Sequence, residues 1–149
     1  VAESDPEIGI VGPKIYYYSE PEKICTIGGD IGFSRTISNL KGKNQLDKGQ
    51  YDFNQRVDFV TTCAMLIKRK VFEKIGLLDS SYFFTWEDED FCFRARKMGY
   101  KVFYAYRSKI WHKVASSTGG MGYTPILRYY LARGIGTIYE KTCQVVALV

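Results

Sequence analysis

Apolar and polar positions alternate along the chain in a way that predicts short strands and helices in turn. Residues 8–12 are apolar or glycine and predict a short buried strand, out of which Pro13 bends the chain. Pro6 and three acidic residues precede this strand, so we expect residues 1–7 to be the end of a helix that leads into it. From residue 15 to residue 55 the pattern is weak, because glycines interrupt short strands and loops.

The second half of the chain has clearer periodicity. Residues 59–67 combine β-branched and apolar side chains and predict a buried strand. A short helix closed by Gly76 is expected over residues 70–75, and a second strand over residues 101–105. Pro125 begins a last stretch with apolar residues at helical spacing. Strands that alternate with helices predict a single layered α/β domain for the whole chain of 149 residues.

The helix expected over residues 86–98 begins with a run of four acids. Thr85 is the predicted N-cap, and the glycine after residue 98 ends the helix. Acids at its start and bases at its end are the arrangement that the helix dipole favours. Asp90 and Arg94 are four residues apart with the acid first, which predicts a surface ion pair.

Asp88 fits this helix account less well than the other three acids. The residues three, four and seven positions later are Phe91, Cys92 and Ala95, so Asp88 lies on the apolar face without a basic partner on its own helix. Partly dry surroundings raise the pKa of a carboxyl group, which is the condition that a general base near neutral pH needs. The competing interpretation is a structural aspartate that caps the helix together with Thr85.

Composition and charge exclude little. The content of 46% hydrophobic and 25% charged residues is typical of a globular protein, and the 12 tyrosines suit a pocket for a sugar ring or a base as well as an aromatic-rich core. The net charge of +5 is spread along the chain, whereas a nucleic-acid arm would show a concentrated patch. A phosphate-bearing ligand and an anionic membrane surface fit this charge equally well.

The cysteines predict a reducing, cytosolic compartment. None of the four is in a CxxC pair, and with one histidine in the chain no zinc-ligand cluster is expected. Cys63 and Cys92 have apolar neighbours in the sequence, as reduced core cysteines do. No signal peptide is recognised, and no apolar run approaches the roughly 20 residues that span a bilayer.

Residues 86–94 have the sequence WEDEDFCFR, which is similar to the WEDVDLCLR signature of family 2 glycosyltransferases of the GT-A fold, in particular their rhamnosyltransferase-like branch. Similar elements stand on both sides of it, and the match runs from about residue 8 to residue 133; they are residues 63–69, 72–79, 99–102 and 112–119. The resemblance implies a partial GT-A (nucleotide-diphospho-sugar transferase) fold, a mixed sheet with flanking helices. Residues 136–149 match the family poorly.

The resemblance also implies roles for the acids of the signature. In inverting members of the family, the aspartate that corresponds to Asp88 removes the proton from the acceptor hydroxyl, which then attacks the sugar as the nucleoside diphosphate leaves. Glu87 is then the neighbouring acid that orients the acceptor or the backbone, and Trp86 belongs to the substrate site. The expected activity is transfer of a sugar from a nucleotide-diphospho-sugar to a glycan or a lipid-linked acceptor, as in cell-surface polysaccharide biosynthesis.

Three further features are carried over from the family. His112 is a candidate ligand of a divalent metal, Mg²⁺ or Mn²⁺, although a lone histidine after a strand is often structural. Ser117, Thr118 and Gly119 belong to a small-residue loop that is either a lid over the donor or a plain surface linker. Arg133 is a candidate contact of the diphosphate, although this chain has glycine next to it where the family has asparagine.

The family's nucleotide-binding βαβ half, which ends in a DxD metal site, has no counterpart in this sequence. We therefore expect these residues alone neither to bind a nucleotide sugar tightly nor to turn it over, and to hold no metal. The alternative is a non-catalytic carbohydrate-binding or scaffold module of the same fold, and nucleic-acid binding is the least favoured option. The intact enzyme would act in the cytoplasm, with peripheral association with the inner face of the membrane as a further option.

Overall fold

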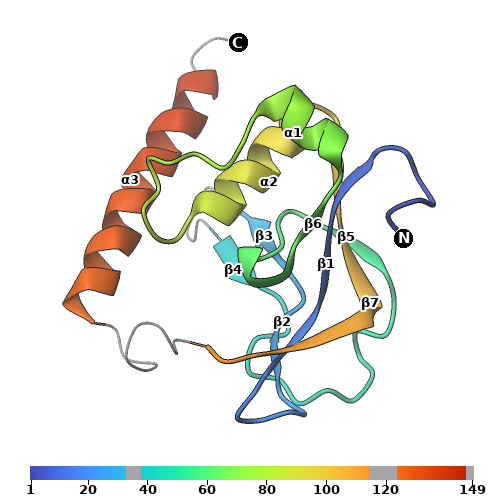
Figure 1. The fold of residues 1–149 in the computed structure, drawn as a ribbon. Coiled ribbons are helices and arrows are strands. Elements are labelled where there is room, and N and C mark those ends of the chain that lie inside the picture. Colours follow the sequence, from blue (N-terminus) through green and yellow to red (C-terminus); the bar gives the residue numbers. More distant parts are fainter. Residues whose placement is uncertain (33–37, 115–123, 147–149) are drawn as a thin grey trace.

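The computed structural model describes residues 1–32, 38–114 and 124–146, with side chains up to residue 141 in the last range. The chain is mixed α/β, as predicted (Figure 1). Its elements follow one another in this order: β1 (Ile8–Tyr17), β2 (Ile24–Thr26), β3 (Gly29–Ile31), β4 (Ser38–Leu40), β5 (Gln55–Val57), a 3₁₀ turn (Thr62–Ala64), β6 (Leu66–Ile67), α1 (Arg69–Ile75), α2 (Glu87–Lys97), β7 (Lys101–His112) and α3 (Pro125–Val146).

Two long strands organise the main sheet. β1 and β7 run parallel and side by side, and β2, β5 and β6 pair with them in antiparallel orientation, in the order β2-β1-β7-β5 with β6 also on β1. β3 and β4 form a separate antiparallel hairpin. The sheet is therefore mixed, as expected.

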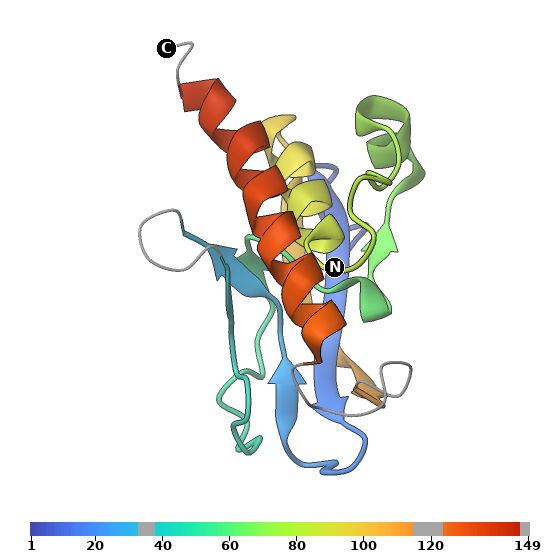
Figure 2. The ribbon, with the colours of Figure 1, turned by 90° about the vertical axis from the view of Figure 1, so that its left-hand side faces the viewer.

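The core lies between this sheet and α2. Phe91, Cys92 and Ala95 have no exposed surface and pack in the same cluster as Val102 and Tyr104 of β7. In Figures 1 and 2, α2 lies between α3 and the long strands. This packing fixes which face of the acidic run is inside the molecule.

The predicted ends of α1 and α2 are confirmed, and the backbone at both ends favours glycine. Gly76 and Gly99 have φ angles of 78° and 87°, which L side chains rarely adopt, and each follows a helix directly or after one residue. The N–H of Gly76 donates to the carbonyl of Phe72 at 2.9 Å, which closes α1. No helix among the described residues is long and apolar enough to cross a membrane.

Two expectations for the N-terminal region are wrong. Residues 2–7 form turns, with the amide of Ile8 donating to the carbonyl of Asp5, and no helix leads into β1. Pro13 does not end the strand, because the pairing with β7 shifts register between Pro13 and Lys14 and continues to Tyr17. A proline, which has no N–H to donate, is tolerated in a strand at such an irregularity.

The buried strand expected over residues 59–67 is also wrong. Phe59 is buried but bonds to Gly29 of β3, which draws the chain away from β1. The 3₁₀ turn follows, and the last two residues of the segment alone pair with β1. Cys63 is consequently exposed rather than a core cysteine, whereas Cys92 is buried as expected. The apolar composition of this segment predicted a buried strand, but hydrogen bonds to residues distant in the sequence determine its backbone conformation.

Candidate functional site

The chain enters α2 through two residues in the left-handed region. Thr85 and Trp86 have φ angles of 69° and 73°, which cost non-glycine residues on the order of 1 kcal/mol each. The predicted N-cap is wrong, because Trp86 occupies the cap position and no side chain caps the helix. The hydroxyl of Thr85 is buried without a hydrogen-bond partner in the described chain. Backbone strain of this kind persists where the surrounding structure imposes it, and it is common at functional sites.

Helix α3 holds Trp86 in this position. The indole N–H donates to the carbonyl of Leu131 at 3.1 Å, and the ring packs in a small cluster with Tyr82 and Ile138. Gly134 allows the close approach, since a Cβ on this residue would lie 2.2 Å from Cδ1 of Trp86. The glycine that departs from the family pattern therefore seats α3 on the start of α2.

A cavity of about 390 Å³ opens below the start of α2, and we call it the acidic pocket. Its walls come from β2, β4, the segment around the 3₁₀ turn, the end of β7 and α3. Four of the predicted site residues line it, namely Trp86, Glu87, Asp88 and His112. Its other lining residues include Thr62, Cys63, Phe84 and Glu89. The fold thus brings the predicted residues at the start of α2 and at the end of β7 together in one cavity.

Asp88 is half-buried and accessible from the acidic pocket. Its Oδ2 accepts from the backbone N–H of Thr62 at 3.3 Å, and its Oδ1 accepts from the backbone N–H of Glu89 at 3.1 Å. The 3₁₀ turn therefore orients the carboxylate toward the pocket. No lysine or arginine is among the described residues that line this cavity.

Glu87 makes fewer hydrogen bonds than Asp88. Its Oε1 accepts from the hydroxyl of Thr62 at 3.3 Å, whereas its Oε2 is buried and has no hydrogen-bond partner in the described chain. Burial raises the pKa of Glu87, and the charge of Asp88 raises it further. This carboxyl group is thereby biased toward the protonated form.

Glu89 is a member of the acidic pocket that the sequence did not single out. Burial raises its pKa well above the usual range, and a hydrogen bond to Asp88 acts in the same direction. In the sequence, the helix dipole accounts for Glu89 as one of the acids at the helix start. Ser38 and Leu40 of the β3–β4 hairpin line the same cavity as Glu89, and no local pattern connects them to α2.

Asp90 and Arg94 form the expected pair, but it is not at the surface. Asp90 is 3% exposed, and its Oδ2 accepts from Nε of Arg94 at 2.8 Å. The other guanidinium nitrogens of Arg94 donate to the carbonyls of Ile75 and Leu77 at 2.8 and 3.0 Å. This acid therefore fastens α2 to the end of α1 and is not part of the pocket.

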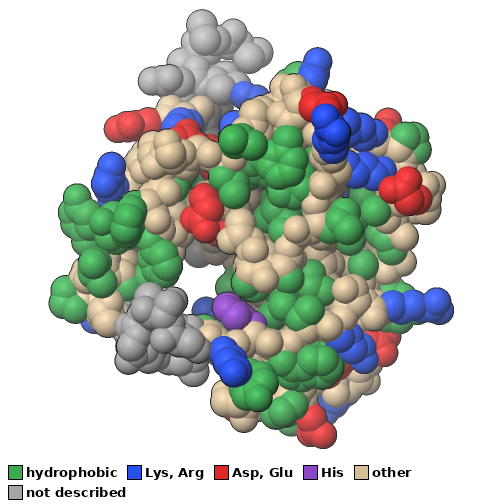
Figure 3. All heavy atoms as spheres, in the orientation of Figure 1, with side chains coloured by type: hydrophobic (Ala, Val, Ile, Leu, Met, Phe, Trp, Pro, Cys, Tyr) green, Lys and Arg blue, Asp and Glu red, His purple; other side chains and the backbone are tan. Residues whose placement is uncertain are grey.

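His112 reaches the acidic pocket from the last position of β7. Figure 3 shows the purple histidine side chain at the edge of a hollow, with a red acidic patch above it. Within the described residues, no group of three or more His, Cys, Asp or Glu side chains is arranged to hold a metal ion. The described part of the chain thus offers a histidine in the right cavity but not a metal site.

The remaining predicted residues lie elsewhere. Ser117, Thr118 and Gly119 are outside the described residues. Arg133 does not line the acidic pocket; it borders a small neighbouring hollow together with Phe83, Phe84 and Tyr130. Arg133 is exposed and makes no ion pair with any described residue.

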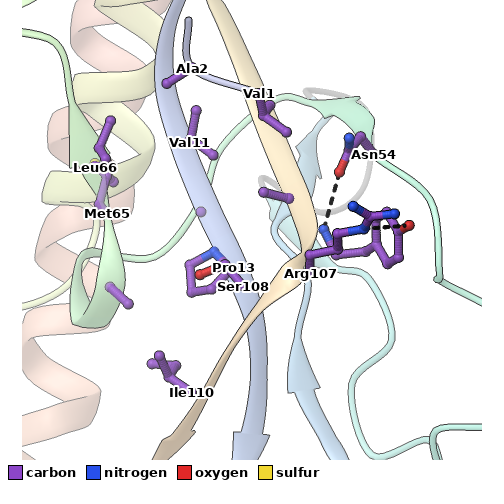
Figure 4. Close-up of a pocket in the computed structure, with 14 residues that line it drawn as sticks. Val1, Ala2, Val11, Pro13, Asn54, Met65, Leu66, Arg107, Ser108 and Ile110 are labelled. Atoms are coloured by element: carbon purple, nitrogen blue, oxygen red, sulfur yellow. Dashed lines mark hydrogen bonds between the residues drawn. The ribbon is translucent and has the colours of Figure 1, made fainter.

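A larger cleft of about 930 Å³ lies where β7 leaves the register of β1 (Figure 4). Its walls are mostly apolar, among them Val11, Met65 and Leu66. No acid, histidine or cysteine is among the described residues that line it. Size alone would favour this cleft, but the groups able to move a proton are in the acidic pocket.

The comparisons with known proteins give limited matches. No family model matches the chain. It is similar to the uncharacterized protein y4gI of Sinorhizobium fredii, with 25% identity over 119 residues, and to the low-salt glycan biosynthesis hexosyltransferase Agl10 of Haloferax volcanii, with 44% identity over 41 residues. The matches cover 76% and 28% of this chain, and 13% of each relative. An α/β chain with a carboxylate-lined pocket is thus linked to a hexosyltransferase through one short segment.

Proposed function

We propose that this chain forms the acceptor-side part of a glycosyltransferase of the GT-A type, with Asp88 as the general base. The observation that carries the proposal is the meeting of Asp88, Glu87 and His112 in one cavity with a wall formed by Trp86. The 44% identity with a hexosyltransferase over 41 residues supports sugar transfer as the reaction class.

In the proposed reaction the Asp88 carboxylate accepts the proton of the acceptor hydroxyl. The oxygen then forms a bond to the anomeric carbon, while the bond from this carbon to the nucleoside diphosphate breaks and the diphosphate leaves with the electron pair. Attack on the side opposite the leaving group inverts the configuration. The hydrogen bonds from Thr62 and from the helix start position the base, and general base catalysis of this kind contributes about 10²–10⁴-fold in rate.

The donor site is proposed to come from residues outside this sequence, since the chain spans only 13% of the length of each relative. The same holds for the divalent metal of the family. His112 would be one ligand, and the others would have to lie beyond the described residues, because these do not form a metal site. We assign no step of the reaction to the metal. The described cysteines are free thiols, and we propose a cytoplasmic location.

The test is a transfer assay on a protein that contains this chain together with its donor half, against a panel of nucleotide sugars. Asp88→Asn keeps the shape of the side chain but cannot accept the proton, and we expect it to lower the transfer rate at least 100-fold. Asp30→Asn, at an exposed residue of β3, is the matched control and should retain the parent rate. Glycan binding without transfer in the parent protein would instead support a non-catalytic module.

A further inference from the structure

Apolar side chains are exposed beside the acidic pocket, where the loop before α2 meets the start of α3. Phe83 and Ile126 are 72% and 62% exposed, although both are large. Together with Phe84, Leu127 and Tyr130 they line a cavity of about 120 Å³, which we call the apolar pocket. A contiguous exposed apolar patch around a cavity is typical of a binding site, whereas apolar residues scattered singly over a surface are not.

The apolar pocket and the acidic pocket share a wall. Phe84 lines both cavities, so that a molecule lying over its ring would reach Asp88 on one side and the apolar pocket on the other. The ring of Phe83 stacks on that of Tyr130 with centroids 4.7 Å apart, which fixes the outer wall. The two cavities thus suit two parts of one ligand, a hydroxyl group and a hydrocarbon chain.

A cation lies next to the apolar pocket. Arg133 borders the small hollow that shares Phe83, Phe84 and Tyr130 with it, and it has no ion-pair partner among the described residues. A guanidinium group without a carboxylate partner is well suited to a phosphate.

We propose, on the basis of the glycosyltransferase function, that the acceptor is a lipid-linked phosphate whose hydrocarbon chain lies in the apolar pocket and whose phosphate is bound by Arg133. The family resemblance implied a contact of Arg133 with the diphosphate of the donor; its place beside the apolar pocket assigns the phosphate to the acceptor instead. The apolar pocket holds the part of the chain next to the phosphate, and the exposed face of Phe83 and Ile126 continues it.

The experiment is a calorimetric titration of the full chain with farnesyl phosphate below its micellar concentration, with farnesol and inorganic phosphate as separate probes. We expect saturable binding of farnesyl phosphate, weaker binding of farnesol and no measurable binding of inorganic phosphate. Phe83→Ser should weaken farnesyl phosphate binding about tenfold, because it removes one wall of the apolar pocket. Phe53→Ser is the matched control, at a phenylalanine that is 51% exposed elsewhere on the surface.

The phosphate contact has its own pair of variants on the same helix. Arg133→Gln should weaken binding of farnesyl phosphate at least fivefold and leave farnesol binding unchanged, whereas Arg128→Gln should change neither. Absence of saturable farnesyl phosphate binding, or equal effects within either pair of variants, overturns the inference. This binding does not require sugar transfer. A protein that binds farnesyl phosphate but transfers no sugar therefore contradicts the proposed function, and one that transfers sugar only to water-soluble glycans contradicts the lipid acceptor.

Discussion

Two clusters of buried charge in this molecule are built on opposite principles. On β1, Lys14 has no exposed surface, and its ammonium group lies 2.8 Å from Asp47 and 2.6 Å from Asp52. Tyr16 donates to the same Asp47. In the acidic pocket, Glu87, Asp88 and Glu89 follow one another, and the described lining offers them no lysine or arginine.

The pKa shifts differ in the same way. Burial alone would raise the pKa of Asp47, but the hydrogen bonds from Lys14 and Tyr16 outweigh it and lower this pKa to about 2. Burial raises the pKa of Glu89, and there the neighbouring acid adds to the effect. The first cluster thus stabilises the fold at neutral pH, whereas the second costs stability and keeps carboxyl groups ready to exchange protons.

The largest effect on stability is expected from breaking the paired cluster. Lys14→Met leaves Asp47 and Asp52 facing each other without a cation, and we expect a loss of about 3 kcal/mol in the free energy of unfolding. Urea denaturation at pH 7 measures it. Lys41→Met, in a pair with Asp30 that is open to solvent, is the control and should cost less than about 1 kcal/mol. Equal losses in the two variants would show that burial of Lys14 does not matter.

A smaller effect is expected where α3 seats Trp86 above the acidic pocket. Gly134→Ala places a methyl group against the indole ring, and we expect a loss of about 2 kcal/mol as the helix is displaced. Gly136→Ala, two residues further on, has no atom within 4 Å of the new Cβ and should be neutral or stabilise α3 by about 0.5–1 kcal/mol. If both variants unfold at the same urea concentration, the contact between α3 and Trp86 is not as described.

The smallest effect on stability is expected from Glu89 and depends on pH. Its folded-state pKa is raised above the unfolded value of about 4.3, so the folded state binds the proton more tightly. The stability from this group is complete below about pH 4.3 and is lost as the pH rises toward the folded-state pKa. Glu89→Gln should therefore match the parent at pH 4 and be more stable by about 1 kcal/mol at pH 8.

Glu73→Gln on α1 is the control for this experiment, because it makes the same side-chain change at an exposed position. A Glu89→Gln variant that is equally destabilised at pH 4 and pH 8 would mean that Glu89 is charged in the folded protein.

Sequence reasoning succeeded where a local signal decides the structure. Gly76 and Gly99 marked the helix ends, and the apolar face of α2 was predicted from the spacing of Phe91, Cys92 and Ala95. The same spacing predicted that Asp88 lies inside the molecule, where the structure has it half-buried in the acidic pocket.

It failed where residues far apart in the sequence decide. Residues 59–67 are apolar enough for a strand. However, Phe59 exchanges backbone hydrogen bonds with Gly29, and the N–H of Thr62 donates to Asp88, so the segment forms a turn instead of a strand. The left-handed Thr85 and Trp86 depend on the contact with Gly134, 48 residues after Trp86, which no periodicity reveals. The β3–β4 hairpin, which lines the acidic pocket together with Glu89, lies in a region where the pattern was weak.

The central claim is that Asp88, and not the acid on either side of it, accepts the proton of the acceptor. Single-turnover rates of sugar transfer by Asp88→Asn, Glu87→Gln and Glu89→Gln, in a protein that includes the donor half, test this claim most directly. We predict a rate at least 100-fold lower for Asp88→Asn and rates within tenfold of the parent for the other two variants. A parent-like rate for Asp88→Asn, or a loss as large in Glu87→Gln, would contradict the account.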